Sequence, residues 1–316
     1  MVKKLIGFVL AILMSVGFYG CASGQQSDEN PGESISAGES APAEKEEVMP
    51  DENYKPAKSS DNTELAELME AKMYTADLSG KSYNLLYRFY LPENYNEKYK
   101  YPLVVYFHGY GECGSNNLNQ LSPDFDFLPN LLNGENLVRY PAIVIAPQCP
   151  VGEVWATKSY DTFFTQYDIT ETPETKSMRA TLALMDQLGK EYSVDQDRIY
   201  VTGVSMGGLA AWDLTARYPE KVAACVPVCG AASPVKNSAN FKDVNVWAFQ
   251  GQLDPLVRPS ITTAMVNAIN QNGGKALLTL YPDADHTLCW VYAFNEENLY
   301  DFLFCSRRGI YNKYFD

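Results

Sequence analysis

Residues 198–208 read Arg-Ile-Tyr-Val-Thr-Gly-Val-Ser-Met-Gly-Gly, and this stretch decides the fold. The β-branched and aromatic residues before Gly203 predict a strand, and the Ala, Leu and Trp residues that follow predict a helix. Ser205 therefore lies on a tight turn between the two, where side chains at Gly203 or Gly207 would crowd the backbone. The pattern predicts a nucleophilic serine. The alternative is a chance match in a glycine-bearing loop.

Apolar segments alternate with helix-like segments on both sides of this turn. Further strands are expected at 73–77, 83–91, 103–107, 142–146, 222–228, 244–249 and 276–281. Helices are expected at 64–72, 125–132, 177–192, 260–270 and 296–304, with a turn at 195–197. The first two strands should form an antiparallel pair at an edge. This alternation predicts an α/β fold with a mostly parallel central sheet and helices on both faces.

Length and charge limit the classes of function. The chain has 316 residues, 46% of them hydrophobic, which is enough for one large α/β domain or two small ones. A net charge of −14 argues against nucleic acid as a partner. Residues 22–62 carry ten acidic residues and three lysines, about half of the net charge. We expect the catalytic domain to span residues 63–316.

The first 62 residues resemble an export signal followed by a tether. Lys3 and Lys4 precede an apolar run that ends before Cys21, as in a signal peptide at residues 1–21. Cys21 follows a glycine and resembles the lipidated cysteine of bacterial lipoproteins; an unlipidated signal peptide or an uncleaved anchor are the alternatives. Residues 22–62 have almost no large apolar side chains, so we expect a disordered linker that holds the domain near a membrane.

Six cysteines follow Cys21, and in an exported protein an even number permits disulfides. Six cysteines allow fifteen pairings, among which the sequence does not choose. Cys113 and Cys149 each follow a predicted core strand and could meet at the edge of the sheet. Cys225 lies in an apolar run and is expected to be a buried thiol.

A serine nucleophile needs a base, and the chain has two histidines. His286 lies in a predicted loop after the last strand, where a base would reach Ser205. His108 precedes the serine in a glycine-rich loop and is expected to bond loop backbone instead. The base needs a carboxylate on its second nitrogen. Asp254, after the penultimate strand, is the main candidate.

Two further acids compete with Asp254. Asp285 adjoins His286, but neighbouring side chains in an extended loop point apart. Asp283 is the reserve candidate.

The attacked carbonyl oxygen becomes an anion and needs hydrogen-bond donors. One donor is expected to be the backbone N–H of Met206, directly after the nucleophile. The other is expected from the loop His108-Gly109-Tyr110-Gly111, where the Tyr110 N–H is the best candidate because flanking glycines let the loop curl inward.

Several segments together resemble an α/β-hydrolase serine esterase. They are Tyr-Arg-Phe-Tyr-Leu-Pro at 87–92, Pro-Leu-Val-Val-Tyr-Phe-His-Gly at 102–109, Ala-Pro-Gln-Cys-Pro at 146–150, the stretch at 198–208, the loop around Asp254, and His286. The chain is similar over residues 73–304 to the family that contains feruloyl and acetyl-xylan esterases, poly(3-hydroxybutyrate) depolymerases and bacterial predicted peptidases.

The resemblance implies a Ser205-Asp254-His286 triad with no metal and no organic cofactor. It also suggests Trp155 as a pocket wall, although an aromatic side chain covering the sheet edge fits equally well. Glu112, together with Asp161, could bond the hydroxyls of a sugar, but solvated carboxylates are the simpler interpretation.

The leading hypothesis is therefore an exported serine carboxylesterase, tethered to a membrane by Cys21. Its expected substrates are acyl or hydroxycinnamoyl esters, for example on plant polysaccharide. The first alternative is a serine peptidase with the same triad. The second is a surface lipoprotein that binds without catalysis, although all three triad residues are present in the sequence.

Overall fold

The computed structural model describes residues 46–47, 62–122, 126–157 and 166–315, all of which belong to one unit spanning residues 44–316. The predicted signal peptide, with Cys21, lies outside the described residues, as does nearly all of the predicted linker. The linker's described residues 46–47 form a short strand, β1 (Glu46–Glu47). Within the described part of the chain, no helix is both long and apolar enough to cross a membrane.

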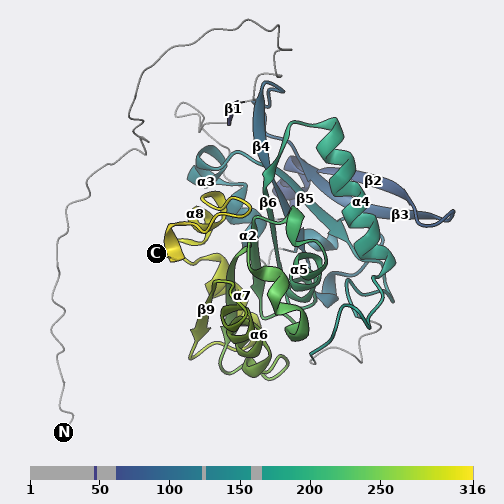
Figure 1. Ribbon diagram of the computed structural model, residues 1–316. Coiled ribbons are helices and arrows are strands. Elements are labelled where there is room, and N and C mark those ends of the chain that lie inside the picture. Colours follow the sequence, from purple (N-terminus) through teal and green to yellow (C-terminus); the bar gives the residue numbers. More distant parts are fainter. Residues whose placement is uncertain (1–45, 48–61, 123–125, 158–165, 316) are drawn as a thin grey trace, which may run out of the picture. The chain divides into compact units, whose positions relative to one another are not determined.

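A twisted sheet forms the centre of this unit (Figure 1). After β1 its strands are β2 (Glu70–Asp77), β3 (Ser82–Tyr90), β4 (Tyr99–Phe107), β5 (Ile143–Gln148), β6 (Val194–Val204), β7 (Ala224–Val228), β8 (Asn245–Gly251) and β9 (Ala276–Tyr281). The spatial order is β2-β3-β5-β4-β6-β7-β8-β9, and β1 pairs with β4. β2 and β3 are antiparallel, as is the pair β3–β5, whereas the pairs from β5 through β4 to β9 are parallel. The predicted mostly parallel sheet with an antiparallel edge pair is confirmed, and the order is that of the α/β-hydrolase fold.

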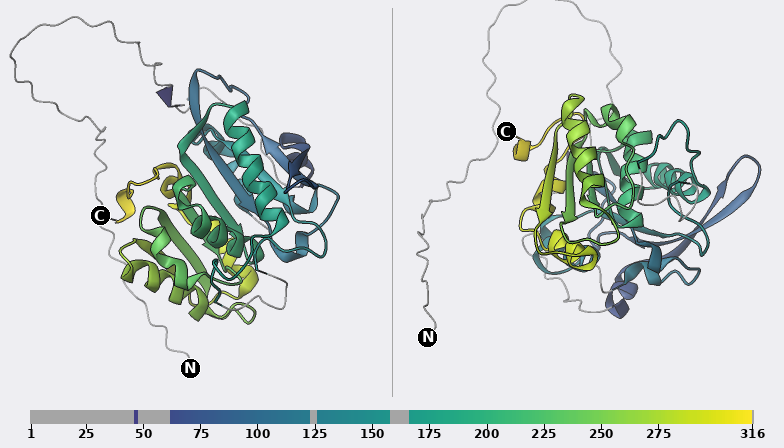
Figure 2. Two further views of the ribbon diagram at one scale, coloured as in Figure 1. Left: turned by 45° about the vertical axis from the view of Figure 1, so that its right-hand side comes forward. Right: turned by 90° about the horizontal axis from the view of Figure 1, so that it is seen from below.

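Helices cover both faces of the sheet. They are α1 (Asn62–Leu68), α2 (Phe127–Leu131), α3 (Gly134–Arg139), α4 (Lys176–Glu191), α5 (Met206–Arg217), α6 (Pro259–Gln271), α7 (His286–Phe294) and α8 (Leu299–Phe304). Figure 2 shows α4, α5 and α6, in teal to green, lying along the strands. These three helices share one apolar core with the sheet, and α1, α2, α3, α7 and α8 share the other.

Alternation along β4 divides its side chains between these two cores. Leu103 and Val105 belong to the core under α4, α5 and α6, and Val104 and Tyr106 belong to the opposite core. All four side chains are buried, because β4 lies in the middle of the sheet with helices on both sides. The continuous apolar run in the sequence therefore predicted a central strand correctly.

Several predicted boundaries were wrong, among them the following three. The turn expected at 195–197 is part of β6, which begins at Val194. Its buried Asp195 accepts a hydrogen bond of 2.8 Å from Arg198 Nε, so the charge that suggested a turn is neutralised within the sheet. The helix expected at 64–72 ends at Leu68, and β2 begins at Glu70. The last helix begins at Leu299 rather than at 296.

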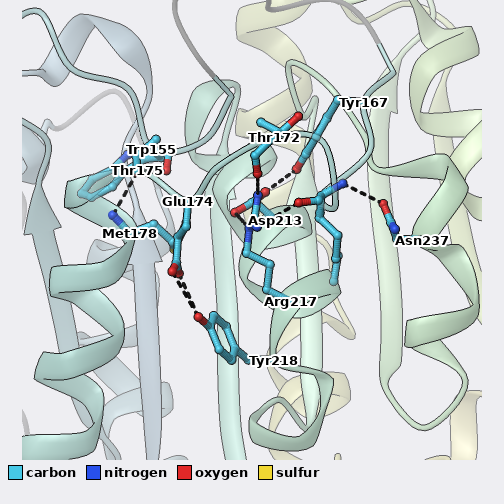
Figure 3. A network of polar contacts seen from close by, with 12 residues as sticks. Trp155, Tyr167, Thr172, Glu174, Thr175, Met178, Asp213, Arg217, Tyr218 and Asn237 are labelled. Carbon is cyan, nitrogen blue, oxygen red and sulfur yellow. Dashed lines mark hydrogen bonds and ion pairs between the residues drawn. The ribbon is translucent and has the colours of Figure 1, made fainter. Parts of the chain in front are cut away.

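A buried ion pair fastens the segment before α4 onto α5 (Figure 3). Asp213, on α5, accepts hydrogen bonds from Arg217 Nε at 2.8 Å and from the Tyr167 hydroxyl at 2.9 Å. The Arg217 guanidinium also donates to the backbone oxygens of Ile169 and Thr172. Burial raises the pKa of the Asp213 carboxyl, while the bonds from Arg217 and Tyr167 favour its ionised form. The Asp213 carboxylate thus helps to connect α5 with the segment that precedes α4.

Replacing Asp213 with alanine should lower the free energy of unfolding by about 3–5 kcal/mol, because it leaves the guanidinium of Arg217 partly buried without its counterion. The Asp213 side chain is 1% exposed and that of Arg217 is 13% exposed. The matched control is Asp186→Ala, which removes the exposed ion pair with Lys221 and should cost less than about 1 kcal/mol. Urea unfolding measures both changes, and equal costs would contradict the assigned role of Asp213.

Candidate active site

Ser205 lies at the sharp turn between β6 and α5. Its backbone has φ 54° and ψ −112°, a left-handed conformation that side chains rarely adopt. The turn is held by hydrogen bonds from the Ser205 N–H to the Val228 oxygen at 2.9 Å and from the Ala231 N–H to the Ser205 oxygen at 3.0 Å. Backbone groups at the end of β7 and just after it thus stabilise the strained conformation of Ser205. The predicted strand-turn-helix geometry is present.

The glycines around Ser205 allow the backbone of β4 to approach. A Cβ atom on Gly207 would lie 1.9 Å from the carbonyl oxygen of Phe107, and one on Gly203 would lie 2.3 Å from the same oxygen. No side chain fits at such distances, which is the steric requirement expected from the sequence. The approach places the start of α5 directly beside the loop that follows β4.

Asp254 and His286 meet at the carboxyl ends of β8 and β9. The Nδ1 atom of His286 lies 2.7 Å from Oδ2 of Asp254. Oδ1 of Asp254 accepts the backbone N–H groups of Leu256 at 2.9 Å and Val257 at 2.8 Å. Because Asp254 accepts on both oxygens, Nδ1 of His286 carries the proton and Nε2 is the basic nitrogen.

The environment of Asp254 keeps its carboxyl ionised. Burial opposes ionisation, but hydrogen bonds from His286 and from the Val257 and Leu256 N–H groups outweigh it and lower the pKa of Asp254. A carboxylate of lowered pKa contributes stability at neutral pH that is lost as the pH falls through its folded-state pKa. The carboxylate is therefore present across the range in which an imidazole acts as a base.

The structure corrects the expected surroundings of His286. This residue does not lie in a loop but is the first residue of α7. Asp285 precedes the helix as its N-cap, and its side chain accepts the Leu288 N–H at 2.8 Å. Asp285 is thereby engaged away from the imidazole, and Asp283 is exposed. Asp254 is the carboxylate that bonds His286.

His108 has a structural place under the glycine-rich loop. Its Nδ1 donates to the Gly109 oxygen at 2.5 Å, and its Nε2 accepts the Cys149 N–H at 2.9 Å. Burial lowers the pKa of His108 to about 4, so the imidazole is neutral at neutral pH. Both nitrogens bond loop backbone, as the sequence suggested.

Trp155 is not a pocket wall, and this expectation is corrected. The side chain is 0% exposed, and a fully buried side chain cannot face an open pocket. Its Nε1 donates to the His108 oxygen at 3.2 Å, and its ring packs edge-on against Phe107 and His108. Trp155 instead packs beneath the loop that follows β4 and supports it.

The two expected oxyanion donors begin neighbouring helical turns. Met206 is the first residue of α5, and Tyr110 is the first residue of the short 3-10 helix η1 (Tyr110–Glu112). A Cβ atom on Gly207 would lie 2.8 Å from the His108 oxygen, so these two starts are adjacent in space. Glu112 is half-buried, and its carboxylate folds back toward Gly109. Asp161 lies outside the described residues.

Two buried glutamines support the site and were missed by the sequence analysis. Gln250 Nε2 donates to Asp254 Oδ2 at 3.0 Å, and its Oε1 accepts the Thr262 hydroxyl at 2.9 Å. Gln148 Oε1 accepts the Asn117 N–H at 2.7 Å and holds the loop after η1. Each glutamine lies at the carboxyl end of an apolar strand, and a lone polar residue there is the signal that could have identified it.

Cys229 completes a group of possible metal ligands with Asp254 and His286. Within the described residues, the ligand atoms of these three lie within 4.8 Å of one another. The 2.7 Å hydrogen bond between Asp254 and His286, however, occupies the oxygen and nitrogen that a cation would need. The arrangement fits a hydrogen-bonded dyad better than a metal centre.

Comparison with known proteins now defines the family. Residues 83–275, more than half of the chain, match the family model described as "Putative esterase". The chain belongs to this esterase family. The match includes Ser205 and Asp254 and ends before His286.

Curated relatives of this esterase-family chain are larger proteins. Dipeptidyl-peptidase 5 of Porphyromonas gingivalis is 24% identical over 249 residues, which are 66% of this chain and 33% of that protein. The bifunctional acetylxylan esterase/xylanase XynS20E of Neocallimastix patriciarum is 36% identical over 56 residues, 18% of this chain and 8% of that protein. The chain thus spans a third or less of the length of these relatives.

Solved structures of esterases share the fold of this family member. A thermostable esterase superposes with a TM-score of 0.68 and 28% identity, covering 77% of this chain and 64% of that one. A ferulic acid esterase superposes with a TM-score of 0.53 and 18% identity, covering 75% of this chain and 98% of that one. The second likeness supports the α/β-hydrolase fold alone.

Proposed function

We propose that the chain is a serine carboxylesterase with Ser205, Asp254 and His286 as its triad. The observation that carries this proposal is the 2.7 Å bond between Asp254 and His286, formed at the same end of the sheet as the strained Ser205 turn. Membership in the esterase family supports the same reaction class.

The mechanism follows from the positions of these groups. Ser205 Oγ attacks the ester carbonyl carbon while Nε2 of His286 takes the hydroxyl proton. Asp254 stabilises the resulting imidazolium through Nδ1. The N–H groups of Tyr110 and Met206 bind the carbonyl oxygen as it becomes negative. His286 then protonates the leaving alcohol, and a water molecule releases the acyl group by the same path.

Apolar side chains around the site favour an ester with an apolar acyl group. Tyr110 is 42% exposed, Val151 77%, Leu253 62% and Leu256 54%. They lie on the three loops that follow β4, β5 and β8, which also carry the oxyanion donor and the acid. A hydroxycinnamoyl ester of plant polysaccharide fits such a surface. The name of the acetylxylan esterase/xylanase relative supports an ester of plant polysaccharide as the substrate.

A serine peptidase is the second candidate, because the dipeptidyl-peptidase is similar over 66% of the chain.

Methyl ferulate and p-nitrophenyl acetate should be hydrolysed with a kcat/KM at least about 100-fold above that for dipeptidyl p-nitroanilides. This ratio corresponds to about 2.7 kcal/mol of transition-state stabilisation. Initial rates with the purified full-length protein measure it, and faster cleavage of the anilides would favour the peptidase.

We also propose that the chain is exported and tethered through a lipid on Cys21. The basic and apolar start of the sequence and the acidic stretch at 22–62 support this placement. Such a position would bring the esterase close to polymers that do not enter the cell. Partition of the full-length protein and of Cys21→Ala between membrane and soluble fractions tests the tether.

A further inference from the structure

Two cysteines lie where the glycine-rich loop meets the end of β5. Cys113 directly follows η1, and its N–H donates to the Tyr110 oxygen at 3.3 Å. Cys149 directly follows β5. The Gly114 N–H donates to the Cys149 oxygen at 2.9 Å. This backbone hydrogen bond connects the two segments directly beside the cysteines.

The side chains of these cysteines face each other. The thiols of Cys113 and Cys149 are hydrogen-bonded to one another, and both are free in this structure. Cys149 also bonds the Ser177 hydroxyl at 3.8 Å. The backbone hydrogen bond keeps the two cysteines side by side, and the contact between their thiols shows that the side chains point toward each other, as a disulfide requires.

We propose that Cys113 and Cys149 form a disulfide bond that fastens the loop bearing Tyr110 to the end of β5. The bond would close a chain segment running from residue 113 to residue 149, which restricts the unfolded chain and so favours the folded one. It would also fix the end of η1, the turn that begins at Tyr110. The proposal rests on the contacts of the thiols and does not depend on the proposed esterase activity.

The two thiols are suited to different steps of the thiol–disulfide exchange that would form this bond. Cys113 is half-buried and can be reached from solvent, whereas Cys149 is fully buried. The hydrogen bond with Cys149 lowers the pKa of the Cys113 thiol, and burial raises that of Cys149. Cys113 is therefore the attacking thiolate and Cys149 the resolving thiol.

The oxidant is a small disulfide or a disulfide-bearing exchange protein. The Cys113 thiolate attacks one sulfur of that disulfide, forms a mixed disulfide and releases one thiolate. Cys149 then loses its proton and attacks the sulfur of Cys113, which releases the second thiolate. Two protein thiols are oxidised and one disulfide is reduced to two thiols.

A second thiol pair provides an internal comparison. Cys229 and Cys289 are also hydrogen-bonded to each other, but both side chains are 0% exposed. Neither can meet an external disulfide while the chain is folded. In the folded protein, oxidation should therefore link the Cys113 pair and leave the Cys229 pair reduced.

The experiment treats reduced, folded full-length protein with oxidised glutathione. Free thiols are then blocked with iodoacetamide, and the digested peptides are identified by mass spectrometry. We expect a linked Cys113–Cys149 peptide and a rise in Tm of about 5 °C or more. Cys113→Ser should lose both effects. Cys305→Ser, which removes an exposed cysteine bonded to Asp301, should keep them.

Three outcomes would overturn the proposal. They are alkylation of both Cys113 and Cys149 after oxidation, a link from Cys113 to another cysteine, or a link that leaves Tm unchanged. Near-UV circular dichroism checks that Cys113→Ser is folded, and Cys113→Ala serves if it is not. No readout uses ester hydrolysis, so a failure of this proposal is distinct from a failure of the proposed function.

Discussion

Ser205→Ala is expected to lower kcat/KM for p-nitrophenyl acetate by at least about 10⁴-fold, because the variant has no nucleophile and the remaining groups only bind and polarise the ester. This loss corresponds to about 5 kcal/mol of transition-state stabilisation. The fold should persist, since the hydrogen bonds that hold the turn come from backbone groups of residues 205, 228 and 231. Steady-state rates with the full-length protein measure the effect.

The matched control is another serine to alanine change. Ser193 is buried directly before β6, where its hydroxyl donates to the Glu97 oxygen at 2.7 Å. Ser193→Ala should cost stability but leave kcat/KM within a few-fold of the wild-type value. Turnover by Ser205→Ala that matches Ser193→Ala would remove Ser205 from the mechanism.

Asp254→Asn is expected to lower kcat by about 10⁴-fold, as the equivalent change does in serine proteases. The structure supplies the reason. Oδ1 of Asp254 accepts two backbone N–H groups, so an asparagine must place its carbonyl oxygen there and its NH₂ group toward His286. Nδ1 of His286 would then have to accept, and the proton would move to Nε2. The imidazole would be held in the tautomer that cannot take the serine proton.

Asp285→Asn and Asp283→Asn are the controls for Asp254→Asn. Asparagine is a good N-cap, so Asp285→Asn should preserve the start of α7 and keep kcat within a few-fold of the wild-type value. Asp283 is exposed and its replacement should have little effect. If Asp283→Asn were the inactive variant and Asp254→Asn the active one, the acid would have to be reassigned.

The elements that local sterics dictate could be predicted from the sequence. The turn at Ser205 is an example, because the need for glycine at 203 and 207 arises within a few residues of the serine. The β4 run also predicted its strand, since burial on both faces demands continuous apolar residues.

Contacts that form only in the folded chain explain the elements that could not be predicted. The start of β6 contains Asp195, which is typical of a turn and is tolerated in the sheet because Arg198 neutralises it. The helix α7 is rich in β-branched and aromatic residues with weak helix propensity. Its formation depends on packing against β7 and β8 and on the cap by Asp285. His286 was therefore assigned to a loop.

The candidate site likewise contains residues that could be predicted from the sequence and residues that could not. The order of Ser205, Asp254 and His286 along the chain predicted which groups would be used, and the structure joins the second to the third. Trp155 was misplaced because an aromatic residue after a strand suits a pocket wall and a buried support equally, and only its neighbours distinguish them. Gln250 was missed because its partner Asp254 is known only from the fold.

A crystal structure of the protein after reaction with an alkyl fluorophosphonate tests the triad most directly. We predict a phosphorus bonded to Ser205 Oγ, with His286 Nε2 about 3 Å from that oxygen and a phosphoryl oxygen bound by the N–H groups of Tyr110 and Met206. An unmodified Ser205, an adduct on another residue, or an imidazole beyond hydrogen-bonding distance of Ser205 Oγ would contradict the account.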